Sequence, residues 1–169
     1  MTYTSAQANK LLRKLNDEHA ALLDKENRSK DFRAAMGEDV ESVRPVYDYA
    51  DTQKKLAELE QRIRHVKHAI NVFNATHVIP DFGMTIDEML VYIPQLTQRK
   101  NKLADMKARL PKQRVEEQYG RQSNIIDYTY ANYDLAAVEA DYEKVSDELS
   151  RAQLALDAVN QRDTFELAE

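Results

Sequence analysis

Apolar residues recur at alternating intervals of three and four positions along most of this chain. The clearest run lies between Leu56 and Phe73, where apolar side chains stand at positions 56, 59, 63, 66, 70 and 73. This spacing places them along one side of a helix, as the seam of a coiled coil requires. With Pro45 in its first turn, where a missing N–H costs nothing, the pattern predicts a helix over about residues 45–74.

Three further stretches show the same alternation and predict helices over about residues 5–25, 86–110 and 134–160. The second of these contains Pro94, which removes one backbone hydrogen bond and is expected to bend the helix. Four helices with narrow apolar seams are typical of antiparallel bundles with shallow crossing angles. The sequence therefore predicts a mainly all-α fold, an elongated antiparallel four-helix bundle with coiled-coil-like heptad seams, in a single domain over residues 1–169.

The segments between the predicted helices differ in character. Thr85 and Glu88 form a capping-box pattern before residues 86–110, with Met84 placed to pack on Met89. Residues 26–43 are polar and irregular, which predicts a long connection with one helical turn. Connections of this length are uncommon unless they are functional, so this one is either a lid or a plain link across the bundle end.

The period changes from helical to alternating between residues 113 and 130. Ile126, Tyr128 and Tyr130 alternate with polar residues, and residues 114–119 are suited to pair with them across residues 120–123, which predicts a small β-hairpin. An isolated hairpin is marginal in water. Packing on the helices is the simplest interpretation, beside contact with a partner and stacking of bases. The candidate interaction surface consists of Tyr119, Tyr128, Tyr130 and Tyr133.

The net charge of −5 is unevenly spread. The stretch from Gln95 to Arg114 contains seven Lys or Arg residues and one acid. The stretch from Asp134 to Glu148 contains six acids and one base. The favoured interpretation is that a basic and an acidic helix lie side by side. The alternative is a phosphate-binding stripe, whose candidate basic face consists of Arg62, Arg64, Lys67, Arg99, Lys100 and Lys102.

No motif for catalysis is present. The chain has no cysteine, which excludes a disulfide, a thiolate nucleophile and a cysteine metal site. It also contains no nucleophile elbow, phosphate-cradling glycine loop or H-E-x-x-H pattern. We therefore predict that the protein is not an enzyme and has no catalytic residues, no cofactor and no metal.

Polar residues gather around the end of the predicted second helix, at a hinge. They are able to hold a small ligand or cation, but the favoured interpretation is that they satisfy the unpaired backbone groups of the helix end. The candidate polar hinge consists of Asn71, Asn74, Thr76, His77 and Asp81.

Three pieces of the sequence resemble one family. They are Ile70–Thr76, the entry Gly83–Leu90 with Arg99–Leu103 after it, and the closing Ala152–Asn160. These segments resemble the uncharacterised bacterial helical proteins labelled septicolysin-like, some relatives of which are labelled viral A-type inclusion proteins. The resemblance implies an all-α bundle with no established activity and no catalytic residues to carry over.

Taken together, these patterns predict a helical scaffold or protein–protein interaction module that self-associates or binds another protein. No run of 18 apolar residues and no signal segment is visible, so we expect a cytoplasmic protein without a membrane partner. The alternative is a nucleic-acid-binding helical hairpin that uses the basic face of the predicted second and third helices.

Overall fold

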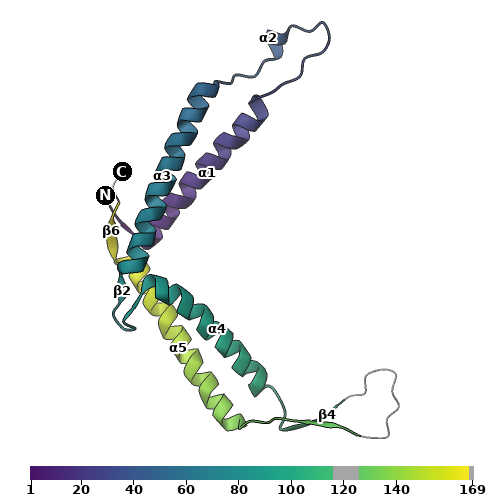
Figure 1. Cartoon of the computed structure of the whole chain (residues 1–169), viewed down its shortest axis with the longest axis vertical. Coiled ribbons are helices and arrows are strands. Elements are labelled where there is room, and N and C mark those ends of the chain that lie inside the picture. The colour runs from purple at the N-terminus through teal and green to yellow at the C-terminus, as the bar shows by residue number, and fades with distance from the viewer. Residues whose placement is uncertain (116–125, 168–169) are drawn as a thin grey trace. The chain divides into compact units, whose positions relative to one another are not determined.

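The computed structural model describes residues 1–115 and 126–167. It is mostly helical with three small two-stranded sheets, so the predicted all-α class is confirmed (Figure 1). The chain divides into two compact units, Met1–His77 with Ala158–Glu169, and Val78–Asp157. We call them unit 1 and unit 2 and describe each by itself. The single-domain prediction stays a prediction.

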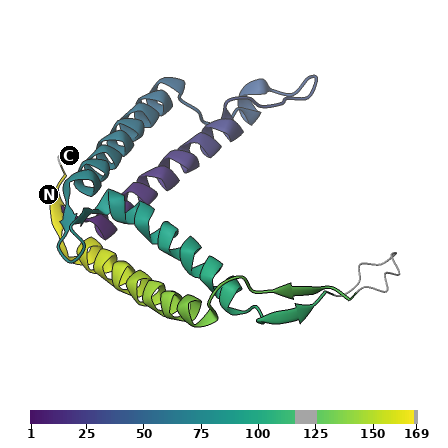
Figure 2. The same cartoon turned by 60° about the horizontal axis from the view of Figure 1, so that its bottom comes forward.

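Unit 1 is built on two helices, α1 (Ser5–Ser29) and α3 (Tyr49–Thr76), which lie side by side in Figures 1 and 2. The facing stripes of α1 and α3 bury an apolar core, and the last described segment of the chain adds one residue to it. Burial of such stripes, rather than helix propensity, supplies most of the stability of helices of this length. The buried core residues are Ala8, Leu15, Val66, Ile70 and Leu167.

Local hydrogen bonds set where the helices of unit 1 begin. Thr4 and Gln7 form a capping box before α1, and the Asp48 carboxylate accepts from the Asp51 N–H at 3.0 Å before α3. The prediction that Pro45 lies in the first turn of this helix was wrong, because the Asp48 cap starts α3 at Tyr49. Between the two helices, α2 (Val40–Val43) is the single helical turn that the sequence predicts.

A short sheet brings the two described ends of unit 1 together. Strand β1 (Thr2–Thr4) pairs antiparallel with β6 (Thr164–Glu166). Beyond the ladder, the Leu167 N–H donates to the Met1 carbonyl at 2.9 Å. The sequence did not predict this sheet.

Unit 2 contains α4 (Ile86–Lys107) and most of α5 (Leu135–Arg162), again side by side in both views. The predicted capping box of Thr85 and Glu88 is present. Before it, β2 (Val78–Ile79) pairs with β3 (Met84–Thr85) through a turn in which Gly83 has a φ of 63°, a conformation that favours glycine. Lys107 on α4 donates to Glu139 on α5 at 2.8 Å, as expected for a basic helix beside an acidic one.

A β-ribbon connects α4 to α5, and it confirms that a hairpin occupies this region. Strand β4 (Lys112–Arg114) pairs antiparallel with β5 (Tyr128–Tyr130). The first strand begins two residues earlier than Arg114, where the sequence predicted it. All six residues of the ladder are exposed.

The chain contains two copies of one element order. The first repeat runs β1, α1, α3, β2 and the second runs β3, α4, α5, β6. The helices α3 and α5 both have 28 residues and begin 86 positions apart. The strands pair across the repeats, because the first strand of each repeat lies beside the last strand of the other.

The repeat extends to the residues that cap and bury the helices. In α1 and α4 the capping threonine, its partner and the innermost heptad residues are all separated by 81 positions. In α3 and α5 the heptad residues are all separated by 86. The matching pairs are Thr4 and Thr85, Gln7 and Glu88, Ala8 and Met89, Leu15 and Leu96, Ile63 and Leu149, Val66 and Ala152, Ile70 and Leu156, and Phe73 and Val159.

Candidate interaction surfaces

The four tyrosines of the predicted interaction surface have different surroundings. Tyr128 and Tyr130 are 44% and 61% exposed on β5. Tyr133 is half-buried, and its hydroxyl donates to the Met106 carbonyl at 2.9 Å, which fastens the end of the ribbon to α4. Tyr119 lies outside the described residues. Of the three tyrosines of this set that the structure describes, Tyr128 and Tyr130 are therefore available on the ribbon surface.

The ribbon register places cations opposite these two tyrosines. Lys112 pairs with Tyr130 and Arg114 with Tyr128. The Lys112 ammonium lies 4.1 Å from the centroid of the Tyr128 ring and 5.5 Å from that of Tyr130. Cation–π contacts of this kind at exposed sites contribute about 0.5–1 kcal/mol each, so they help to hold an otherwise marginal ribbon together.

The six cations of the predicted basic face belong to both units. Arg62, Arg64 and Lys67 lie on α3 in unit 1, and Arg99, Lys100 and Lys102 lie on α4 in unit 2. Within the units, Arg64 is 4.0 Å from Glu60, and the Lys100 ammonium is 5.8 Å from the centroid of the Tyr142 ring on α5. The common basic face stays a prediction.

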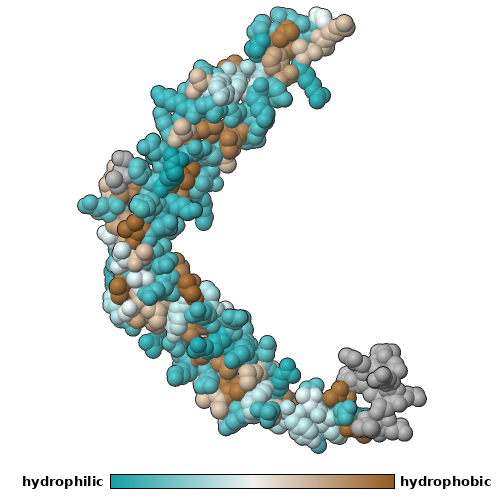
Figure 3. All heavy atoms as spheres, viewed as in Figure 1, coloured by the Kyte–Doolittle hydropathy of each residue, from teal (hydrophilic) through white to brown (hydrophobic). Residues whose placement is uncertain are grey.

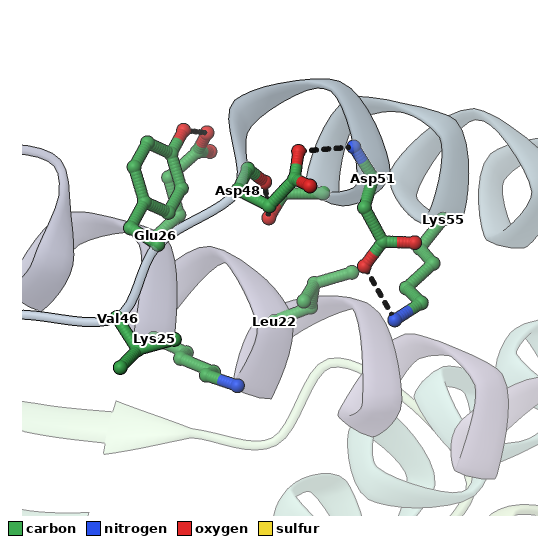
Figure 4. A pocket seen from close by; sticks show the side chains of 9 residues that line it. Leu22, Lys25, Glu26, Val46, Asp48, Asp51 and Lys55 are labelled. Atoms are coloured by element: carbon green, nitrogen blue, oxygen red, sulfur yellow. Dashed lines mark hydrogen bonds and ion pairs between the residues drawn. The ribbon is translucent and has the colours of Figure 1, made fainter.

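Two adjoining hollows lie along the pair α1 and α3. One of about 160 Å³ forms where Val46 and Tyr47 return onto α1, and Figure 4 shows its side chains. A second of about 230 Å³ is lined by Glu18, Leu22, Lys55, Glu58, Leu59 and Arg62. Leu22 and Lys55 line both. We call this pair of hollows the α1–α3 groove.

The first hollow is bordered by the Glu26 carboxylate, which accepts two hydrogen bonds. The Tyr47 hydroxyl donates to Glu26 Oε1 at 2.6 Å, and the Gln53 amide donates to the same oxygen at 2.7 Å. The hydrogen bond to Glu26 raises the pKa of Tyr47 to about 12. These two hydrogen bonds tie the connection between α1 and α3 to both helices, so the role of this carboxylate is structural.

The polar hinge residues mainly complete the end of α3. The Thr76 hydroxyl donates to the Val72 carbonyl at 2.8 Å, and the His77 N–H donates to Phe73 at 2.8 Å. Asn71 and Asp81 are exposed, and Asn74 is half-buried with a buried Oδ1. Within residues 1–115 and 126–167, no group of three or more His, Asp or Glu side chains is placed to hold a metal ion.

One hinge residue makes a contact that the sequence did not predict. His77 Nε2 is 2.7 Å from Asp163 Oδ2, and Arg162 donates to Asp163 Oδ1 at 2.6 Å. Hydrogen bonds from Arg162 and then from His77 lower the pKa of Asp163. His77 also stacks on Phe73, which stacks on Phe165 of β6. We call this the His77–Asp163 clasp, because it holds the last strand to the end of α3.

The surface of the molecule carries no single large apolar field in the view of Figure 3, where apolar residues form small groups separated by hydrophilic ones. Among the described residues, no helix is both long and apolar enough to cross a membrane. The features described above that suit recognition are the ribbon, the α1–α3 groove and the charged helix surfaces.

Comparison with known proteins supports the fold. No protein-family model matches the chain, and no curated protein is significantly similar to it. A crystal structure of a functionally unknown conserved protein from Corynebacterium diphtheriae matches with a TM-score of 0.60 and 15% identity, covering 98% of this chain and 100% of that one. This similarity concerns the fold alone, and the resemblance to septicolysin-like proteins stays a prediction.

Proposed function

We propose that this protein is a cytoplasmic, non-enzymatic helical scaffold that self-associates through the α1–α3 groove. The observation that carries the proposal is the thickness of unit 1. It is built on two long helices, so the stripes of α1 and α3 that face one another are buried while the rest of each helix is available for contact.

The buried apolar residues of α1, Ala8 and Leu15, lie in its first half. Further along α1, Leu22 is half-buried and lines the second hollow together with the half-buried Leu59 of α3. The groove therefore has an apolar floor that one more helical layer would cover, and covering it would gain hydrophobic free energy.

The rim of the groove suits a second copy of the same chain. It carries both signs of charge, Glu18 and Glu58 beside Lys55 and Arg62. In a two-fold contact each residue type meets its counterpart in both directions, so a rim of mixed sign is able to pair with itself. Two α1–α3 pairs packed in this way form an antiparallel four-helix bundle between two copies, whereas the sequence predicted such a bundle within one chain.

Light scattering over a concentration series tests the proposal. We expect the wild type to have twice the mass of the 19.5 kDa chain. Arg62→Glu replaces a cation of the second hollow by a carboxylate beside Glu18 and Glu58 and is expected to yield the monomer. Arg64→Glu is the matched control, since Arg64 lies on the same helix but does not line the groove, and it should remain dimeric. A wild type that stays monomeric throughout contradicts the proposal.

A further inference from the structure

The two faces of the ribbon differ in chemistry. Strand alternation places Lys112, Arg114, Tyr128 and Tyr130 on one face and Gln113 and Thr129 on the other. Asp127 has the parity of Thr129, so its carboxylate belongs to the second face. The first face thus joins two cations and two aromatic rings without a carboxylate among the described ladder residues. We call it the basic–aromatic face.

The fold does not require this face. The first repeat has the same helices and caps, but among its described residues no strands pair between α1 and α3, where the single turn α2 lies instead. The second repeat therefore carries an extra element on a shared frame. In Figures 1 and 2 the paired strands extend beyond the ends of α4 and α5 rather than packing on them, and both tyrosines stay exposed.

The arrangement of the two rings fits separated bases. Their centroids are 6.5 Å apart and their planes are tilted by 51°. This distance is about twice the 3.4 Å spacing of successive nucleotides in a stacked strand, so two neighbouring bases can meet the rings only after unstacking from each other. Exposed aromatic rings beside a cationic track are the usual means of binding single strands without strong sequence preference.

We propose that the basic–aromatic face binds single-stranded nucleic acid. Tyr128 and Tyr130 stack on bases, while Lys112 and Arg114 contact the phosphates. Lys112 lies over one face of each ring, so a base stacks on the opposite face or displaces the ammonium, which then contacts the phosphate. Because the net charge of the chain is −5, binding depends on these two local cations, and their phosphate contacts should make it weaken as salt rises.

Fluorescence anisotropy with labelled oligo-dT and oligo-U tests this on the full chain, starting at about 50 mM salt. Both probes should bind. Lys112→Gln with Arg114→Gln should weaken binding and flatten the dependence of log affinity on log salt by roughly 1.4, since each phosphate contact on a single strand contributes about 0.7. Arg99→Gln with Lys102→Gln removes the same charge from the candidate basic face on α4, so an equal loss there would favour that face as the binding site. Lys10→Gln with Arg13→Gln, at exposed positions of α1, should leave affinity unchanged.

The stacking role has its own pair of variants. Tyr128→Leu with Tyr130→Leu should weaken binding about fivefold or more for each ring lost, whereas Tyr128→Phe with Tyr130→Phe retains the rings and should bind like wild type. Circular dichroism of each variant shows whether the helices persist. If the ribbon itself is lost in the Leu variant, the retained affinity of the Phe variant and the salt slope of the Lys112 and Arg114 variant still decide the question.

Several results overturn the proposal. They are no binding at low salt, equal loss in the α4 variant or the α1 control, or binding that survives the Leu variant and is displaced equally by polyglutamate, which would indicate general attraction of anions or an acidic protein partner. A Leu variant of lower molar mass than wild type would instead make the face an interface between copies. Self-association through the groove is tested separately by Arg62→Glu, so the two proposals can fail independently.

Discussion

The two repeats of this chain share the same order of strands and helices and differ in the connection between their two helices. In both, a strand leads through a capping threonine into a helix, and a helix of 28 residues leads into a second strand. In the first repeat, the connection folds back, with Tyr47 bonded to Glu26. In the second, it extends as a ribbon with Tyr128 and Tyr130 exposed. The strands and helices common to both repeats form the fold. The repeats differ in the connection between their two helices, and that is where we place recognition.

The largest loss of stability is expected when a core leucine is truncated at matching positions of the two repeats. Leu15 and Leu96 are 2% and 1% exposed, and removing such a side chain leaves a cavity. We expect Leu15→Ala and Leu96→Ala each to lower the free energy of unfolding by about 2–5 kcal/mol, measured by urea denaturation. Leu90→Ala, at a 47% exposed position, is the control and should change it by less than about 0.5 kcal/mol. A large loss in only one of the two core variants would show that the repeats are not equivalent.

A smaller effect is expected at the His77–Asp163 clasp, whose members occupy matching positions 86 apart. Because the folded pKa of Asp163 is lowered, its ionised form stabilises the fold above the unfolded pKa of about 3.9. This stabilisation is lost as pH falls through the folded value. Asp163→Asn should therefore lower the free energy of unfolding by about 1–2 kcal/mol near neutral pH.

The same variant should differ less from wild type in acid. Thermal unfolding at several pH values measures this difference, with Asp157→Asn, an exposed neighbour on α5, as the control. A difference that stays constant from neutral pH to below the folded pKa would mean that the carboxylate charge is not what stabilises the clasp.

The smallest loss of stability is expected at the capping threonines of the two repeats. Thr4 and Thr85 accept from the N–H groups of Gln7 and Glu88, both at 3.2 Å. Thr4→Ala and Thr85→Ala should each cost about 1 kcal/mol, and together about twice that because the sites are independent. Substitution by Ser retains the hydroxyl and should restore most of the loss, whereas a Ser variant as unstable as Ala would assign the effect to the threonine methyl group.

The sequence predicted those parts of the fold whose pattern of apolar residues repeats over many positions. The heptad from Leu56 to Phe73 and the capping box at Thr85 need only local information, and both are present. The strands β1, β2, β3 and β6 have two or three residues each, too few to show an alternation. Their pairing also depends on contacts between residues far apart, such as Tyr3 with Phe165.

The candidate surfaces were predictable to a similar degree. Tyrosine alternation indicated the exposed Tyr128 and Tyr130, but their cationic neighbours emerge only from the register that sets Lys112 against Tyr130. The repeat is hard to predict from the sequence because most matching positions differ in residue type, as in Ala8 and Met89, both 0% exposed. Recognising it would have pointed to Asp163, the counterpart of His77.

The pairing of β1 with β6 gives the chain a circular order. The sheet of β2 and β3 joins the first repeat to the second through a covalent turn, and the sheet of β1 and β6 joins the second to the first through hydrogen bonds alone. The Met1 ammonium donates to the Leu167 carbonyl at 3.3 Å, which adds one hydrogen bond to this second junction. In topological terms, each repeat is therefore joined to the other at two equivalent two-stranded sheets.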